Sequence, residues 1–163
     1  MYIALVRRVL EEAVGVYASN VKADVPSVLG QVRQHIDHTS AEHYKDEPAI
    51  EYEDPLCRLG YLYRHAAANA TLFEHALRNS PEAKEKVRAA HQGTLRVCAV
   101  GGGPGTELLG LTKYLVGGDA FPRKIAFTVL DGVPHWGETW QHLAEVVEDE
   151  FRKHLETAGV ASR

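Results

Sequence analysis

The run Gly101-Gly102-Gly103-Pro104-Gly105 constrains the fold of this chain more than any other feature, because of what stands on each side of it. Before it, residues 95–100 are apolar and partly β-branched, which is typical of a strand that is buried on both faces of a sheet. After it, residues 106–116 have the apolar periodicity of a helix that ends at Gly117. The sequence therefore predicts a strand, a glycine loop and a helix in that order.

A second unit of the same kind follows. Residues 125–130 form another short apolar segment, and Asp131 stands directly after it. A final helix is predicted from Trp136 to residue 155 by the helical spacing of its large apolar side chains. Alternation of strands and helices predicts a parallel sheet with right-handed crossover connections.

The first ninety-three residues contain no such alternation and are predicted to be helical. An apolar stripe at helical spacing is formed by Ile3, Val6, Leu10, Ala13 and Tyr17, and a separate helical segment is expected at 70–77. Arg58, in the helix after Pro55, either extends to solvent or pairs with a carboxylate. Asp54-Pro55 and Ser80-Pro81 each combine a residue that caps a helix with a proline that suits the first helical position. The polar stretch 38–53 is predicted to be a loop or linker. Our expectation is an α/β fold in two regions, with a helical N-terminal cap at 1–93 and the start of a Rossmann-like parallel sheet at 94–163.

The glycine loop and Asp131 predict a ligand with a nucleotide moiety. Glycines after a parallel strand let the backbone approach a ligand, and the following helix directs its free N–H groups toward it. An acid at the end of the next strand can accept hydrogen bonds from both ribose hydroxyls. Two simpler interpretations remain open, namely a glycine-rich turn that binds nothing, and an aspartate that only forms a turn before Gly132.

The spacing of the loop disfavours two other nucleotide sites. A dinucleotide-binding loop needs a small residue at the last position of Gly-x-Gly-x-x-Gly/Ala, and Thr106 occupies that position here. A nicotinamide-binding fragment is therefore the weaker alternative. A triphosphate-binding P-loop requires Gly-Lys-Ser/Thr, which is absent.

Residues 100–107 resemble motif I of the class I S-adenosylmethionine-dependent methyltransferases, with Gly101, Gly103 and Gly105 at the three glycine positions. The resemblance implies that the chain binds S-adenosylmethionine or S-adenosylhomocysteine, with the glycines along the methionine and ribose and Asp131 on the ribose hydroxyls. Trp136 can stack on the adenine, although a place in the core is the favoured interpretation for it, and Tyr61 and Tyr63 of the cap can cover the cofactor. The candidate cofactor-binding residues are Gly101, Gly102, Gly103, Gly105, Thr106, Glu107, Asp131, Gly132, Trp136 and Tyr63.

One position departs from the family pattern. The family usually has an acid two residues before the first glycine, where it helps to hold the amino group of the cofactor, and this chain has Ala99. The departure implies weak binding, a substitute such as Glu107, or a site that has lost the cofactor. Residues 52–63 also resemble eukaryotic relatives of the fungal ribosomal-RNA uridine methyltransferases. The sequence does not identify the methyl acceptor, for which RNA and protein are both candidates.

Only two strands are evident, whereas the family fold has seven. We therefore expect a fragment or short form that is inactive alone, or one that completes its sheet by dimerising or swapping through the exposed edge. A non-catalytic interaction or sensor module on a degenerate methyltransferase fold is the alternative. No catalytic residue and no metal site are predicted.

The charge and the cysteines set weaker limits. A formal net charge of −4 argues against nucleic-acid binding by this piece alone. Cys57 and Cys98 are expected to be reduced, buried thiols in a cytoplasmic or nuclear protein. No apolar stretch is long enough to span a membrane.

Overall fold

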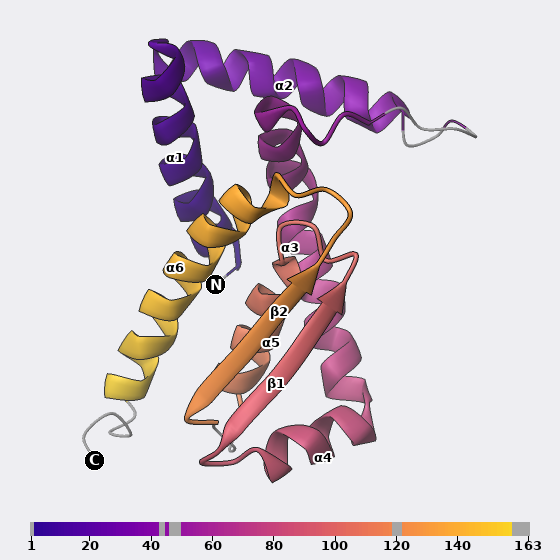
Figure 1. Cartoon of the computed structure of the whole chain (residues 1–163). Helices are drawn as coiled ribbons and strands as arrows, with labels where there is room; N and C mark the ends of the chain where they lie inside the picture. Colours follow the sequence, from indigo (N-terminus) through magenta and orange to yellow (C-terminus); the bar gives the residue numbers. More distant parts are fainter. Residues whose placement is uncertain (1, 43–44, 46–49, 119–121, 158–163) are drawn as a thin grey trace.

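The computed structural model describes residues 2–42, 45, 50–118 and 122–157 (Figure 1). Two strands, β1 (Thr94–Val100) and β2 (Lys124–Leu130), lie side by side and are parallel, with Thr94 opposite Lys124 and Val100 opposite Leu130. The predicted parallel arrangement is confirmed. In chain order the helices are α1 (Tyr2–Val21), α2 (Val25–Glu42), α3 (Pro55–Asn79), α4 (Pro81–Ala89), α5 (Thr106–Val116) and α6 (Trp136–Thr157).

Both predicted capping signals are present. The Asp54 carboxylate accepts a hydrogen bond from the Leu56 N–H at 2.8 Å, and Ser80 Oγ accepts one from the Ala83 N–H at 3.1 Å. Between these two caps α3 runs without interruption for 25 residues, although the sequence suggested a separate segment from Ala70 onward. The helix continues because residues 61–79 contain neither proline nor glycine, the residues that most often end a helix.

Only one face of the sheet is covered by the described helices. Leu95 and Val97 of β1 and Phe127 of β2 pack into the main core with α5 and α6. The alternate side chains point the other way, and Val100 is 82% exposed. The prediction of a strand buried on both faces was therefore wrong, because no described element packs on the second face. For the same reason Cys98 is exposed, whereas Cys57 is buried as expected.

The helices α3 and α5 approach each other very closely at Gly110. A Cβ atom at this position would lie 2.5 Å from the Ala70 carbonyl oxygen, so only glycine allows this separation. The contact fixes the start of α5, and with it the preceding glycine loop, relative to the middle of α3.

The N-terminal helices differ from the predicted pattern in which face they bury. Leu5 and Val9 are buried in α1, whereas Ile3 is 79% exposed, although the periodicity placed Ile3 on the apolar stripe. The buried face is shifted because α1 packs against α2, α3 and α6 together. In α2 the helix continues to Glu42, so the loop predicted for 38–53 was wrong over 38–42. Residues 43–44 and 46–49 of that loop lie outside the described residues.

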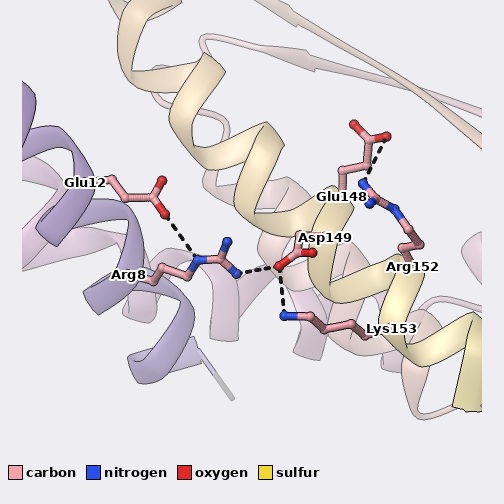
Figure 2. A network of polar contacts seen from close by, with 6 residues as sticks. All are labelled: Arg8, Glu12, Glu148, Asp149, Arg152 and Lys153. Carbon is pink, nitrogen blue, oxygen red and sulfur yellow. Dashed lines mark hydrogen bonds and ion pairs between the residues drawn. The ribbon is translucent and has the colours of Figure 1, made fainter.

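An ion-pair network joins the first and last helices (Figure 2). Arg8 of α1 donates from Nη1 to Asp149 Oδ2 of α6 at 2.7 Å and from Nε to Glu12 Oε1 at 3.2 Å. Lys153 Nζ also donates to Asp149, at 2.9 Å. These hydrogen bonds, from Arg8 above all, hold the pKa of the Asp149 carboxyl near about 2.

Asp149 is therefore expected to make the stability of the fold depend on pH in the acid range. Its pKa is lowered by folding, so its contribution is present above the unfolded value of about 3.9 and is lost as the pH falls toward about 2. We expect the melting temperature of Asp149→Asn to lie below that of the wild type at pH 6 and to converge with it near pH 2. Glu148→Gln is the control, since its partner Arg152 lies 4.0 Å away and both side chains are exposed. A difference that persists unchanged at pH 2 would contradict this assignment.

No helix among the described residues has both the length and the apolar character that crossing a membrane requires.

Candidate functional site

The glycine loop begins at the carboxyl end of β1 and leads into α5 (Figure 1). Gly101, Gly103 and Gly105 have φ values of +65°, +49° and +75°, a region that side chains disfavour. Gly105 is the N-cap residue of α5 and makes no side-chain cap hydrogen bond. The alternate spacing of the three glycines is therefore a conformational requirement of this turn.

Close contacts also restrict the loop. A Cβ on Gly105 would lie 2.3 Å from the ring of Trp140, and one on Gly102 would lie 2.8 Å from the Ala99 Cβ. Thr106, directly after the loop, is buried. By contrast, Gly132 has open space around its Cα and no positive φ, so nothing in the backbone demands glycine there.

Asp131 is attached directly to the glycine loop. Its Oδ2 accepts a hydrogen bond from the Gly103 N–H at 2.8 Å, and its Oδ1 accepts one from the Val133 N–H at 2.9 Å. The second bond is the local turn that was the simpler interpretation of this residue. The first bond spans 28 residues and shows that the end of β2 and the loop after β1 form one unit.

Three aromatic residues, Tyr52, Tyr61 and Trp136, form a cluster beside this loop, which we call the ring cluster. The Trp136 ring centroid lies 5.3 Å from that of Tyr52 and 5.4 Å from that of Tyr61. Trp136 is only 5% exposed, and a Cβ on Gly103 would lie 3.6 Å from its indole. Trp136 therefore belongs to the core, as favoured, and also touches the loop.

A buried arginine ties together the two chain segments that carry the ring cluster. Arg58 is 3% exposed and donates from Nη1 to the carbonyl oxygens of Tyr52, at 2.9 Å, and Glu53, at 2.8 Å. Its Nη2 donates to Glu138 Oε2 of α6 at 3.0 Å. The sequence left open whether Arg58 extends to solvent or pairs with a carboxylate, and the structure shows the pairing. Arg58 thus connects the segment before α3 with the start of α6.

The phenols of the ring cluster are strongly protected from ionisation. Burial is the main cause that raises the pKa of Tyr52 to about 12, and nearby groups, among them Asp131, raise it further. Burial also raises the pKa of Tyr61, and the charges of Glu107 and Asp131 act in the same direction. Both phenols are therefore neutral at physiological pH and are available as hydrogen-bond donors.

Glu107 stands in the first turn of α5, next to the loop. Its Oε2 is buried and has no hydrogen-bond partner in the structure. Burial raises the pKa of this carboxyl, against a smaller lowering by its own backbone N–H. A buried carboxylate oxygen without a partner is rare in folded proteins, because the lost hydration is not replaced.

The structure brings most of the predicted site residues together, but not all of them. Gly101 to Glu107, Asp131, Gly132 and Trp136 lie in or beside one loop region at the carboxyl ends of the strands. Tyr63 lies elsewhere: its side chain is 67% exposed and lines an apolar groove of about 560 Å³ between α1, α2 and α3. Tyr61, two residues earlier, is the tyrosine of α3 that reaches the ring cluster.

Tyr52 and Arg58 were not predicted as site residues. Arg58 and Tyr61 stand three residues apart, which places them on the same side of α3. This spacing could have indicated that Tyr61, and not Tyr63, lies on the same face of α3 as Arg58. Tyr52 had no such signal, since it reaches the cluster from an irregular segment that the carbonyl contacts of Arg58 hold in place.

Searches against protein-family models, curated proteins and solved structures gave no match to this chain.

Proposed function

We propose that this chain is the S-adenosylmethionine-binding part of a class I methyltransferase, built on the first units of a Rossmann-like sheet behind a helical cap. The observation that carries the proposal is the hydrogen bond between Asp131 and the Gly103 N–H. It joins the acid to the glycine loop at the carboxyl ends of two parallel strands, where ligands bind in open α/β sheets.

The residues present suit such a ligand. Gly101 at the start of the loop is exposed, and Gly105 at the N-cap of α5 contributes no side-chain cap hydrogen bond. N–H groups at the start of a helix suit a polar or anionic group of a ligand. Asp131 keeps acceptor capacity beyond its two backbone bonds, because each carboxylate oxygen can accept more than one hydrogen bond. When bound, S-adenosylmethionine supplies a methyl group that is activated by its sulfonium, while the chain binds and orients it.

The proposal includes a methyl acceptor, for which RNA and protein are the candidates.

We propose further that the free outer edges of β1 and β2 pair with a second copy or with a swapped segment, since neither strand has a second neighbour among the described residues. Unpaired strand edges tend to recruit further strands.

A second function, a non-catalytic interaction or sensor module, is favoured by one specific observation. The uncovered sheet face presents Val100 and Leu130, the latter 53% exposed, at the very end of the sheet where the loop begins. Such an apolar surface next to the loop is typical of a protein contact. This apolar surface and the absence of an acid at Ala99 both suit a fold that binds a protein partner and no longer binds the cofactor.

Calorimetric titration with S-adenosylhomocysteine, S-adenosylmethionine and NAD decides between the two functions. We expect binding of both adenosyl ligands at micromolar dissociation constants and none of NAD, because Thr106 replaces the small residue that a dinucleotide loop needs. A folded chain that binds none of the three would contradict the proposal and favour the interaction module.

A further inference from the structure

A groove of about 530 Å³ lies where the second half of α1 meets the starts of α3 and α6, and we call it the Arg58 groove. Arg58 and its partner Glu138 both line it. Its lining, as far as the described residues show it, includes neither the glycine loop nor Asp131. The groove is therefore separate from the candidate cofactor site, and a ligand bound there would not depend on the proposed function.

The guanidinium of Arg58 has one edge that is only half used. Its Nη1 donates to the carbonyl oxygens of Tyr52 and Glu53. On the other edge of an arginine, the Nε–H and one Nη2–H point the same way and can serve two oxygens of one anion. Here Nη2 donates to Glu138 Oε2 at 3.0 Å, whereas Nε is buried and has no hydrogen-bond partner among the described residues. This edge therefore makes one hydrogen bond where it could make two.

The unused donor destabilises the free chain. Arg58 is 3% exposed, and a buried N–H group without an acceptor loses its hydration without replacement. Glu138 offsets little of this loss, because its side chain is 75% exposed and its pairing competes with water. The edge formed by Nε and Nη2 thus lacks the acceptor that suits it, which is a planar anion with two oxygens.

A purely structural role for Arg58 is the competing explanation. It accounts for Nη1, which holds the segment before α3 through two carbonyl groups. It does not account for the other edge, since a structural arginine–carboxylate pair would be expected to use both parallel donors. Glu138 stands in the first turn of α6, where the helix dipole stabilises an exposed acid without any help from an arginine. Glu138 is therefore a partner that a ligand can replace.

The lining of the groove indicates the class of ligand. Arg58 is the one arginine or lysine among its described lining residues, so it compensates a single negative charge. A phosphate monoester carries nearly two charges at neutral pH and would leave the second one near Glu138. The apolar part of the lining includes two valines that are about half exposed, and a ligand with an apolar body would cover them; these residues are Val16, Val21 and Leu59.

We propose that the Arg58 groove binds a small monocarboxylate with an apolar body. The two carboxylate oxygens accept from Nε and Nη2 of Arg58, and the body lies against the apolar side chains of α1 and α3. Binding displaces the Glu138 carboxylate from Nη2 into solvent, which its exposed position allows. The bonds from Nη1 to the Tyr52 and Glu53 carbonyl groups are kept.

The first test compares phenylacetate with phenylacetamide, its neutral isostere, by calorimetric titration of the full chain. We expect the wild type to prefer the carboxylate by about 10-fold to 100-fold, the worth of a charged hydrogen bond. Arg58→Lys keeps the positive charge but cannot form two parallel hydrogen bonds. In this variant the preference should fall below about 3-fold.

Glu138→Gln should have the opposite effect on the affinity for phenylacetate. The substitution removes the carboxylate that competes for Nη2, and an exposed ion pair is worth a gain of about 2-fold to 5-fold in affinity. Glu148→Gln is the matched control, because it removes another exposed carboxylate of α6 that does not line the Arg58 groove. This control should bind phenylacetate as the wild type does. An equal gain in both variants would overturn the proposal, since it would show a general effect of net charge.

The Nε–H resonance of Arg58 gives a readout that does not depend on affinity. We expect it to shift downfield when phenylacetate is added, because the proton gains an acceptor, and to stay in place with phenylacetamide. If Arg58→Lys does not fold, Glu138→Gln and this resonance still test the proposal on folded proteins. Equal binding of the two compounds, no binding of phenylacetate, or binding that leaves the resonance unmoved would each overturn the proposal. Failure of S-adenosylhomocysteine to bind would contradict the proposed function alone.

Discussion

Gly105→Ala is expected to destabilise the chain by about 2–5 kcal/mol, the largest effect of any single methyl group in the loop. Two causes add. The φ value of +75° costs a residue with a Cβ about 1–2 kcal/mol, and the new methyl would lie 2.3 Å from the Trp140 ring. Trp140 cannot easily move away, because its ring stacks on Phe127 at a centroid distance of 5.4 Å. Urea unfolding at neutral pH measures the loss directly, and a total stability of about 5–15 kcal/mol is ordinary for one domain.

Gly101→Ala separates these two causes. Gly101 has a similar φ of +65°, but nothing lies within 4 Å of the position that its Cβ would take. We expect it to lose only the conformational part, about 1–2 kcal/mol. Equal losses at both positions would contradict the contact with Trp140 and would indicate that backbone conformation alone fixes glycine in the loop.

Asp131→Ala is expected to abolish measurable binding of S-adenosylhomocysteine, with a loss of about 100-fold or more. The substitution removes the acceptor for the Gly103 N–H and, under the proposed function, the acceptor for the ribose hydroxyls. Hydrogen bonds to a charged group contribute about 1.5–3 kcal/mol each, and two of them account for a loss of this size. Calorimetric titration of the folded variant provides the measurement.

Asp131→Asn is the matched control for this loss. The amide keeps an oxygen that can accept from the Val133 N–H or the Gly103 N–H, but it has lost the charge and one acceptor. We expect an intermediate affinity, about 10-fold below that of the wild type. If Asp131→Ala binds as tightly as the wild type, Asp131 is only a turn former, and the ribose contact is excluded.

These predictions rest on features that differ in how far the sequence revealed them. The capping residues Asp54 and Ser80 and the start of α5 at Thr106 were predictable, because a cap is decided by the few residues around it. The pairing of β1 with β2 was also predictable, since a strand, a helix and a second strand in succession almost always form a parallel unit.

The surroundings of the candidate site were less accessible. Tyr61 and Tyr63 were both candidate cap residues, and only Tyr61 lies beside Trp136, because helix rotation decides which of two tyrosines faces the loop. The roles of Arg58 and of Tyr52 depend on carbonyl groups and on Glu138, eighty positions away along the chain.

The sequence by itself determined the local conformations of this protein: where helices begin, where the chain needs glycine, and that two strands run in parallel. Each of these follows from steric and hydrogen-bonding preferences of neighbouring residues. Only the tertiary structure decided which faces are covered, so that Cys98 and Val100 are exposed and the Glu107 Oε2 atom is buried. The reason is that burial is set by the elements that pack on a segment, and these come from distant parts of the chain.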